Sequence, residues 1–123
     1  MQVKCGTDII EISRIKQSIE EMGEHFKNRI YTEQEIEFCE SKKKQKFQHY
    51  AARFAAKEAT FKAISQLLDN KFDISFNQIE VFNDSNGRPY IRINDFEFKE
   101  IKSVDISLSH CREYAIANVV VLM

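Results

Sequence analysis

The segment from Arg53 to Lys62 places four charged side chains in what otherwise has the pattern of a buried helix. Apolar residues recur at helical spacing along and beside it, namely Phe47, Tyr50, Phe54, Phe61, Ile64 and Leu68. Where this stripe should continue, the sequence has Lys57 and Glu58, and Lys62 follows Glu58 one turn later on the same face. Because a buried charge is costly unless it is paired or binds an ion, the segment is a candidate site.

The same residues also allow a purely structural interpretation. Glu58 and Lys62 can form an exposed ion pair one turn apart, which contributes only about 0.2–0.5 kcal/mol. The stem of Lys57 can run along the edge of the stripe and bring its ammonium group to water. The helix alone favours this interpretation, and the rest of the chain reverses that preference.

A second acid that suits chemistry is Asp8, which follows Gly6 and Thr7 in an otherwise apolar segment. An acid there is a poor core residue, but it is a good ligand for a hard cation or a residue of a turn. Asp8 on a strand and Glu58 on a helix can supply two oxygens to Mg²⁺, which proteins commonly hold by one or two carboxylates, substrate phosphates and water. The basic residues that would neutralise such phosphates are Arg53, Lys57 and Lys62.

Two further segments carry polar residues at places where a ligand can be met. Residues 86–90 read Asn-Gly-Arg-Pro-Tyr, for which turn chemistry is a sufficient explanation. Ser107, Ser109 and His110 lie at the end of a predicted strand. A single histidine at a strand end is more often a surface residue than a ligand-binding one, so each segment is weak evidence by itself.

The overall charge excludes general nucleic-acid binding, since the net charge is −1 and the pI is near 6.3. The distribution is more informative: residues 11–40 carry eight Glu against four Lys or Arg, whereas residues 41–63 carry seven Lys or Arg against one Glu. A local basic zone in a nearly neutral protein suits a small anionic ligand.

The cysteines and the apolar runs indicate a cytoplasmic protein that is not in a membrane. The three cysteines are odd in number and form no C-x-x-C, so we expect reduced thiols. The N-terminus has no signal-peptide pattern, and no apolar run is long enough to cross a membrane. Cys111 beside His110 leaves a redox function as a minor alternative.

The sequence predicts one α+β domain over residues 1–123, with a mostly antiparallel sheet packed against one long helix. The first predicted elements are a strand over 2–9 interrupted at Gly6 and a helix over 14–22 that Ser13 caps and Gly23 ends. A helix over 33–41, with Thr32 and Glu35 as its capping box, and a long helix over 45–69 follow. The chain then forms a hairpin that turns at Asn86-Gly87 and two strands over 104–109 and 114–122. The last strand is apolar on both faces over Ala115–Leu122, which favours a three-fold oligomer that buries the extra face.

Taken together, four segments resemble the bacterial holo-acyl-carrier-protein synthase family, the small trimeric phosphopantetheinyl transferases. The resembling segments are G-T-D-I with Arg14, R-F-A-A-K-E-A-x-x-K-A over 53–63, N-G-R-P-Y over 86–90, and S-L-S-H with E-Y-A-x-A over 107–117. They occur in family order and span almost the whole chain. The central run is specific, and the others gain weight from their joint spacing.

The resemblance implies that coenzyme A gives its 4′-phosphopantetheine group to a serine of apo acyl carrier protein, and that adenosine 3′,5′-bisphosphate leaves. It implies that Asp8 and Glu58 bind Mg²⁺ and that Lys62 acts with them on the phosphates. The serine proton goes either to Glu58 or to a water on the metal. The resemblance further implies that the enzyme is a homotrimer with active sites between subunits, and that Arg14 docks the carrier protein. The residues expected to face coenzyme A are Lys44, Lys46, Arg53, Lys57, Ser109 and His110.

Two departures from the family pattern concern binding. The helix after Arg14 carries Glu20, Glu21 and Glu24, whereas relatives usually have a more basic helix to meet an acidic carrier. The loop over 42–46 reads Lys-Lys-Lys-Gln-Lys, without an arginine that some relatives place there. The alternative function is a non-catalytic trimeric module that binds coenzyme A or another nucleotide, which would need the basic groups but not two metal-binding carboxylates.

Overall fold

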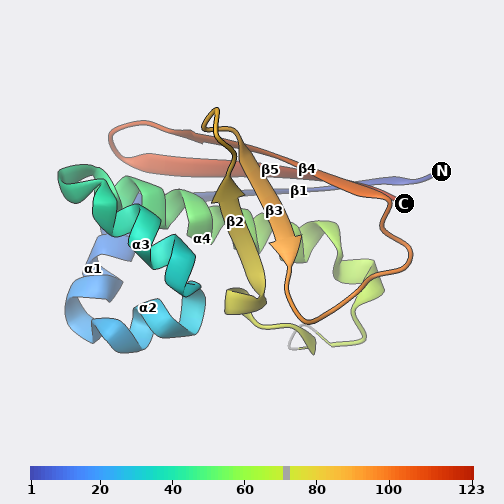
Figure 1. The fold of residues 1–123 in the computed structure, drawn as a ribbon, viewed down its shortest axis with the longest axis horizontal. Helices are drawn as coiled ribbons and strands as arrows, with labels where there is room; N and C mark the ends of the chain where they lie inside the picture. Colours follow the sequence, from blue (N-terminus) through green and yellow to red (C-terminus); the bar gives the residue numbers. More distant parts are fainter. Residues whose placement is uncertain (71–72) are drawn as a thin grey trace.

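The computed structural model describes residues 1–70 and 73–123. The elements in chain order are β1 (Val3–Glu11), α1 (Ile12–Met22), α2 (Glu24–Ile30), α3 (Glu33–Ser41), the short 3-10 helix η1 (Lys43–Gln45), α4 (Lys46–Ala63), η2 (Ser65–Leu67), η4 (Phe76–Gln78), β2 (Ile79–Asn83), β3 (Pro89–Ile93), β4 (Ser103–His110) and β5 (Tyr114–Leu122). In Figure 1, α4 runs along the molecule with the β1, β5 and β4 strands on one side and the β2–β3 hairpin and α3 on the other.

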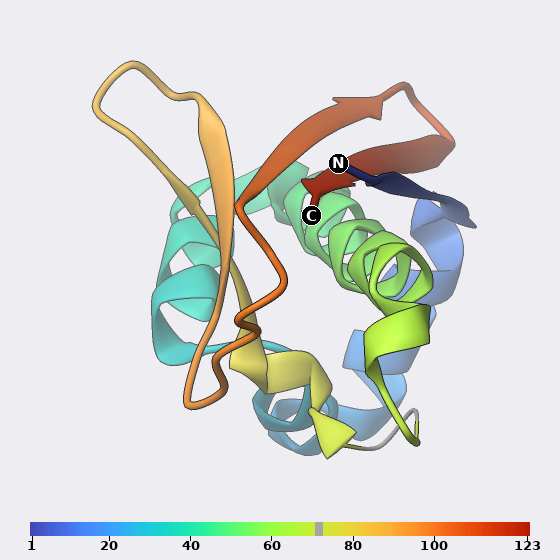
Figure 2. The same ribbon diagram turned by 90° about the vertical axis from the view of Figure 1, so that its right-hand side faces the viewer.

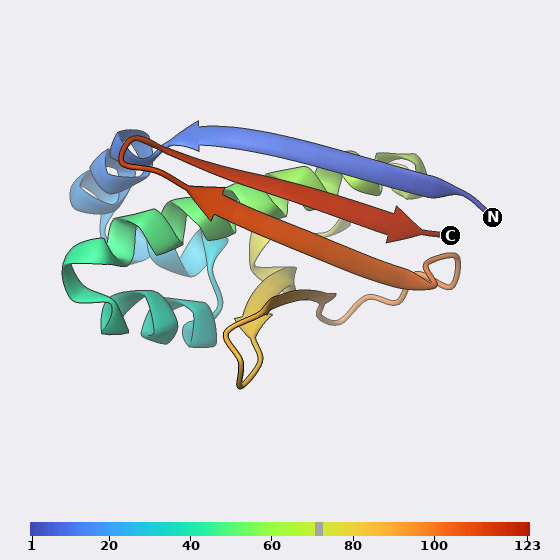
Figure 3. The ribbon, with the colours of Figure 1, turned by 90° about the horizontal axis from the view of Figure 1, so that it is seen from above.

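Both sheets are antiparallel, which confirms the α+β prediction. The larger sheet has the strand order β1-β5-β4, and the smaller sheet is the β2–β3 hairpin. Figure 3 shows the three-stranded sheet lying over α4, with α1 at the end where β1 stops. Figure 2 shows α4 end-on, enclosed between this sheet and the hairpin. None of the helices in the described residues is long and apolar enough to cross a membrane.

The strand β1 is continuous through Gly6, so the predicted interruption at this residue was wrong. Gly6 is required by packing: a Cβ there would lie 1.9 Å from the carbonyl oxygen of Ala59 on α4. The face of α4 that meets the sheet is built from alanines that are at most 3% exposed, namely Ala52, Ala55, Ala56, Ala59 and Ala63. Small residues on both elements therefore allow the close approach of helix and sheet that the alanines predicted.

The helix ends differ in part from the predictions. The capping box of Thr32 and Glu35 is confirmed at the start of α3. Helix α1 begins at Ile12, not Arg14, because the Ile12 N–H donates to the Glu113 carbonyl (2.9 Å), and Ser13 is not its cap. Helix α2 was not predicted, because Gly23, expected only to end the helix before it, also directly precedes α2. Helix α4 is shorter than predicted, since it ends at Ala63 and continues only as the 3-10 turn η2.

The predicted turn at Asn86-Gly87 is confirmed between β2 and β3. The strands pair up to Asn83 and Pro89, so the loop covers residues 84–88. The Asp84 Oδ1 atom accepts hydrogen bonds from the N–H groups of Asn86 and Arg88 (both 2.9 Å). Gly87 has φ +80°, a left-handed conformation that glycine adopts without steric cost.

Candidate functional site

The structure brings Asp8, Glu58 and Lys62 together between β1 and α4. The Lys62 ammonium group donates to the Asp8 Oδ1 atom (3.3 Å) and to the Thr7 carbonyl oxygen (2.9 Å). Asp8 and Glu58 line the same cavity, of about 430 Å³. A strand acid and a helix acid that are 50 residues apart in sequence therefore face one volume, as the sequence predicted.

The walls of this cavity combine polar and apolar groups from β1, α1, α2 and α4. Arg14, Gln17 and Ser18 line it from α1, together with the apolar side chains Ile15, Phe26 and Phe54. A second cavity, of about 300 Å³, shares Glu58 and is lined further by Phe61, Lys62, Ser65 and Leu68. Glu58 therefore lines both cavities. The first cavity also contains Arg14, and the second also contains Lys62.

The donor set fits a cation that takes part of its coordination from a substrate. Two carboxylates face the cavity, and among the described residues no group of three or more His, Cys, Asp or Glu side chains is placed to hold a metal. A complete protein cage is therefore not formed there. Proteins commonly hold Mg²⁺ by one or two carboxylates, and phosphates and water complete its coordination shell. Asp8 and Glu58 therefore fit that ion.

Arg53 lies on another face of α4, among α3 and β2 residues. Its Nη2 group donates to Asn83 Oδ1 (2.7 Å), and its guanidinium carbon lies 4.1 Å from the centre of the Phe38 ring. Only 2% of the residue is exposed, and its buried Nε–H has no partner in the described residues. A buried donor without a partner is costly, so the environment of Arg53 is incomplete in the isolated chain.

His110 lies beside His49, with ring centres 6.0 Å apart. Burial, followed by the nearby charges of Arg53 and Lys42, lowers the pKa of His49 to about 4. Its imidazole is therefore neutral at pH 7. Ser109 does not join these rings, because neighbouring residues of a strand point to opposite faces and Ser109 is paired with Ile116 on β5.

The basic residues before α4 lie at the N-terminal end of that helix. Lys46 pairs with the Glu40 Oε1 atom (3.3 Å) and lies over the Phe47 ring. Lys44 lies on the exposed turn η1. Within the described residues, no hydrogen bond or ion pair joins the group of Asp8, Glu58 and Lys62 to Arg53 or His110. The predicted site residues therefore form two separate groups in one chain.

Lys57 does not lie where a ligand can reach it, so the structure does not support its expected contact with coenzyme A. Its side chain is fully buried, and its ammonium group donates to Glu35 Oε1 (2.8 Å), to the Phe76 carbonyl (2.9 Å) and to the Ile79 carbonyl. Burial lowers the pKa of Lys57, and the charge of Glu35 opposes this change. The ammonium group links α4 to α3, to η4 and to the first residue of β2.

Sequence reasoning missed Glu35 as the partner of Lys57. Its two carboxylate oxygens accept hydrogen bonds from the N–H groups of Thr32 and Val81 (both 2.9 Å), besides the lysine. The available signal was a capping-box acid on one helix and a lysine in the apolar stripe of another. Nothing in the spacing of 22 residues joins the two, because this contact depends on how α3 packs on α4.

Comparison with known proteins agrees with this geometry. A profile described as the 4′-phosphopantetheinyl transferase superfamily matches residues 4–119. A curated holo-[acyl-carrier-protein] synthase from Ruminiclostridium cellulolyticum is 44% identical over 98% of this chain and 92% of its own length. Another, from Dehalococcoides mccartyi, is 48% identical over 94% of each chain.

Solved structures show the same fold. A holo-(acyl-carrier-protein) synthase from Bacillus anthracis, solved in complex with CoA (3′,5′-ADP), has a TM-score of 0.79 and 36% identity over 96% of this chain and 94% of its own. The Helicobacter pylori enzyme, solved with coenzyme A, has a TM-score of 0.80 and 33% identity over 96% and 99%. The match covers the elements that carry Asp8, Glu58 and Lys62, and the chain belongs to the 4′-phosphopantetheinyl transferase superfamily, among the holo-acyl-carrier-protein synthases.

Proposed function

We propose that this protein transfers the 4′-phosphopantetheine group of coenzyme A to a serine of an apo acyl carrier protein. The observation that carries the proposal is that Asp8 and Glu58 line one cavity together with Arg14, while Lys62 donates to Asp8 and lines a second cavity that shares Glu58. The names of the relatives and the coenzyme A complexes of two of them support the same substrates.

In this reaction the serine oxygen attacks the phosphorus atom that carries the pantetheine group. A new O–P bond forms, the P–O bond to the nucleotide breaks, and adenosine 3′,5′-bisphosphate leaves with the bonding electrons. Lys62, whose side chain is 55% exposed, can turn to the phosphates and offset the charge of the leaving group. Glu58, or a water beside it, takes the serine proton.

Asp8 and Glu58 would hold Mg²⁺, which would neutralise pyrophosphate charge and align the reacting groups. In the structure, Asp8 is already balanced by Lys62. Lys62 therefore keeps the carboxylate of Asp8 oriented toward the cavity before the substrate arrives.

We further infer that the protein is a homotrimer and that each active site draws on two copies. The outward face of the three-stranded sheet exposes apolar side chains, namely Val3 (62%), Ile9 (60%), Tyr114 (43%) and Val120 (43%). Exposed apolar side chains on the face of a sheet suit an interface between copies of the chain. A neighbouring copy can then bring Arg53, Lys44, Lys46 and His110 to the Asp8 group, from which they are separate within one chain.

The surface beside the Asp8 cavity suits a carrier protein with mixed charge. Arg14 lines the cavity, and its positive charge attracts an acidic carrier. Glu20, Glu21 and Glu24 are all exposed further along, and Glu21 accepts a hydrogen bond from Gln17 (3.0 Å). These glutamates therefore favour a carrier whose surface is basic or neutral where it meets them. The three free cysteines support a reducing compartment such as the cytoplasm.

The test is incubation with apo carrier protein, coenzyme A and Mg²⁺, followed by mass spectrometry of the carrier. The proposal predicts a mass increase of one phosphopantetheine on a serine, which a metal chelator abolishes. Binding of coenzyme A without any mass increase would instead favour the non-catalytic binding module, and a mass increase unaffected by the chelator would contradict the metal role.

A further inference from the structure

Asn83 joins the buried Arg53 on α4 to the loop between β2 and β3. It is the last residue of β2, and its Oδ1 atom accepts a hydrogen bond from Arg53 Nη2 (2.7 Å). Its Nδ2 group donates to the Gly87 carbonyl oxygen (2.9 Å). Both ends of one amide are therefore used, and they connect a helix to a loop that follows it about 30 residues later in the sequence.

The loop fixes the direction of this amide. Residues 84–88 are closed by their own main-chain hydrogen bonds, because the Asp84 N–H donates to the Arg88 carbonyl (2.9 Å) and the Gly87 N–H donates to the Asp84 carbonyl (3.0 Å). The Gly87 carbonyl is thus a fixed acceptor for the amide N–H. The opposite orientation of the amide would set its N–H groups against those of Arg53, donor against donor. The amide oxygen is therefore the atom that faces Arg53.

This contact leaves Arg53 with one nitrogen that a ligand can reach. Nη2 is bonded to Asn83. Nε is the only nitrogen of this side chain that is both buried and without a partner in the described residues, so Nη1, which makes no hydrogen bond with them, reaches the surface. Only 2% of the residue is exposed, and the centre of the Phe38 ring lies 4.1 Å from the guanidinium carbon. The direction of the guanidinium therefore decides whether Nη1 meets a ligand.

Asn83 holds Arg53 without neutralising its charge. On the same helix, the buried Lys57 is paired with the Glu35 carboxylate (2.8 Å). Arg53 has no ion pair with the described residues, and its hydrogen-bond acceptor is a neutral amide. A buried charge is costly unless it is paired or binds an ion. The positive charge of Arg53 therefore remains available to an anionic ligand.

We propose that Asn83 is a positioning residue for the transfer reaction, an inference that rests on the proposed function. Asn83 directs Nη1 of Arg53 toward a phosphate group of coenzyme A and leaves the charge of the guanidinium uncompensated until that phosphate arrives. It acts only through Arg53. The Gly87 carbonyl has an indirect part, since it sets the direction of the Asn83 amide.

The test uses two variants of Asn83, for which titration calorimetry measures the affinity for coenzyme A and a transfer assay measures kcat and both KM values. Asn83→Ala leaves Arg53 undirected and should weaken binding of coenzyme A about tenfold, the equivalent of one charge-assisted hydrogen bond. The KM for coenzyme A should rise, while kcat and the KM for the carrier stay as in the parent. Asn83→Asp keeps an acceptor for Arg53 but pairs with its charge, so it should weaken binding at least as much.

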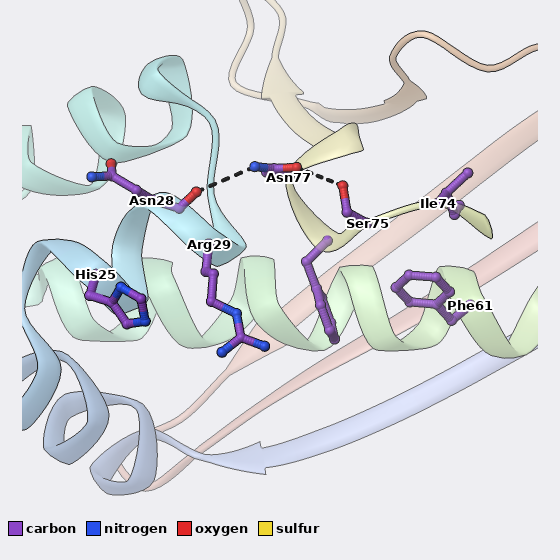
Figure 4. A pocket seen from close by; sticks show the side chains of 8 residues that line it. His25, Asn28, Arg29, Phe61, Ile74, Ser75 and Asn77 are labelled. Atoms are coloured by element: carbon purple, nitrogen blue, oxygen red, sulfur yellow. Dashed lines mark hydrogen bonds between the residues drawn. The ribbon is translucent and has the colours of Figure 1, made fainter. Parts of the chain in front are cut away.

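Two controls separate positioning from a structural role. Asn28 lies at the rim of the cavity in Figure 4 and joins Asn77 only through its main-chain carbonyl oxygen (3.3 Å). Its side-chain amide makes no hydrogen bond with the described residues, so Asn28→Ala should bind coenzyme A like the parent. In an Arg53→Met background, Asn83→Ala should cause no further loss, because a residue that acts through Arg53 has no effect without it.

Other results contradict the proposal. If Asn83→Asp binds coenzyme A like the parent and Asn83→Ala does not, the uncompensated charge of Arg53 has no part in binding. If neither variant changes the affinity, or if the losses of Arg53→Met and Asn83→Ala add, Asn83 does not act through Arg53. Circular dichroism checks that the variants are folded, and the two Asn83 variants suffice if Arg53→Met is not. If the unaltered protein does not bind coenzyme A, the proposed function itself fails.

Discussion

Lys57 and Lys62 lie five residues apart on α4, and the structure gives them opposite environments. The Lys57 side chain is 0% exposed and is bonded to Glu35, whereas that of Lys62 is 55% exposed and faces Asp8. Removing one partner of a buried ion pair leaves the other charge uncompensated and typically costs about 3–5 kcal/mol. An exposed pair contributes about 0–1 kcal/mol.

The two lysines therefore predict opposite results for the same substitution. Lys57→Met should lower the free energy of unfolding by about 3–5 kcal/mol, whereas Lys62→Met should change it by less than about 1 kcal/mol but slow carrier modification. Urea unfolding and a transfer assay on the two variants measure this contrast. Equal stability losses would mean that Lys57 is not an essential part of the core.

At the residue scale, the sequence placed Asp8 and Glu58 correctly in one cavity because each acid breaks an apolar pattern. The same reasoning failed for Lys57, which also breaks the pattern but does so to reach Glu35. Pattern identifies a charge that needs a partner. Whether the partner is a ligand or another side chain depends on tertiary packing, which spacing along the chain does not show.

At the element scale, the contact between β1 and α4 positions the two acids, and Gly6 sets its closeness. Gly6→Ala would place a Cβ 1.9 Å from the Ala59 oxygen, a backbone atom that cannot turn aside. We expect a loss of at least about 1–3 kcal/mol, as for other overpacked cores, together with reduced transfer. Urea unfolding measures it, with Lys4→Ala on the same strand as the control. A variant as stable as the parent would show that β1 and α4 can separate without cost.

Helices α2, α3 and α4 are joined at Glu40, which accepts hydrogen bonds from Tyr50 (2.6 Å), Lys27 (3.0 Å) and Lys46 (3.3 Å). The Tyr50 hydroxyl, with smaller help from Lys27, lowers the pKa of Glu40 to about 2 from its usual 4.5. The folded state thus favours the ionised form. The stabilisation is fully present above pH 4.5 and is lost as the pH falls toward 2.

Unfolding free energies measured across this acid range test the role of Glu40. Glu40→Gln should lower stability near neutral pH and flatten the decline between about pH 4.5 and 2. Glu37→Gln, an exposed change on the same helix, should leave the slope as it is in the parent. If the free energy of unfolding of Glu40→Gln falls with pH as steeply as that of the parent, other carboxylates cause the acid sensitivity.

The element predictions succeeded where the signal is local. The Thr32 and Glu35 capping box and the Asn86-Gly87 turn depend on residues within a few positions of one another, and both are confirmed. Helix α1 instead begins where the Glu113 carbonyl receives the Ile12 N–H, a contact across about a hundred residues. Helix α2 was missed because Gly23 ends one helix and directly precedes another.

At the scale of the whole molecule, the exposed apolar residues on the outer face of the sheet lead us to predict a trimer. Val120→Asp places a charge on the central strand β5 of that face, where Val120 is paired with Cys5 and Asp105. The variant should sediment as a monomer and lose transfer activity, because Arg53 and His110 of a neighbour are then absent. Met22→Asp, at an apolar residue that is 48% exposed on α1, should remain trimeric. A monomeric parent protein with full activity would contradict the shared site.

The central claim is that Asp8 and Glu58 carry the transfer from coenzyme A to the carrier. The most direct measurement is the rate of phosphopantetheine addition to the carrier, followed by mass spectrometry across a magnesium titration, for the parent, Asp8→Ala and Glu58→Ala. Both variants should remain folded by circular dichroism, since neither acid forms part of the core. Turnover should fall at least about a hundredfold, as when a main electrostatic contributor is lost. Folded variants with near-parental rates at limiting magnesium would contradict the assignment of the site.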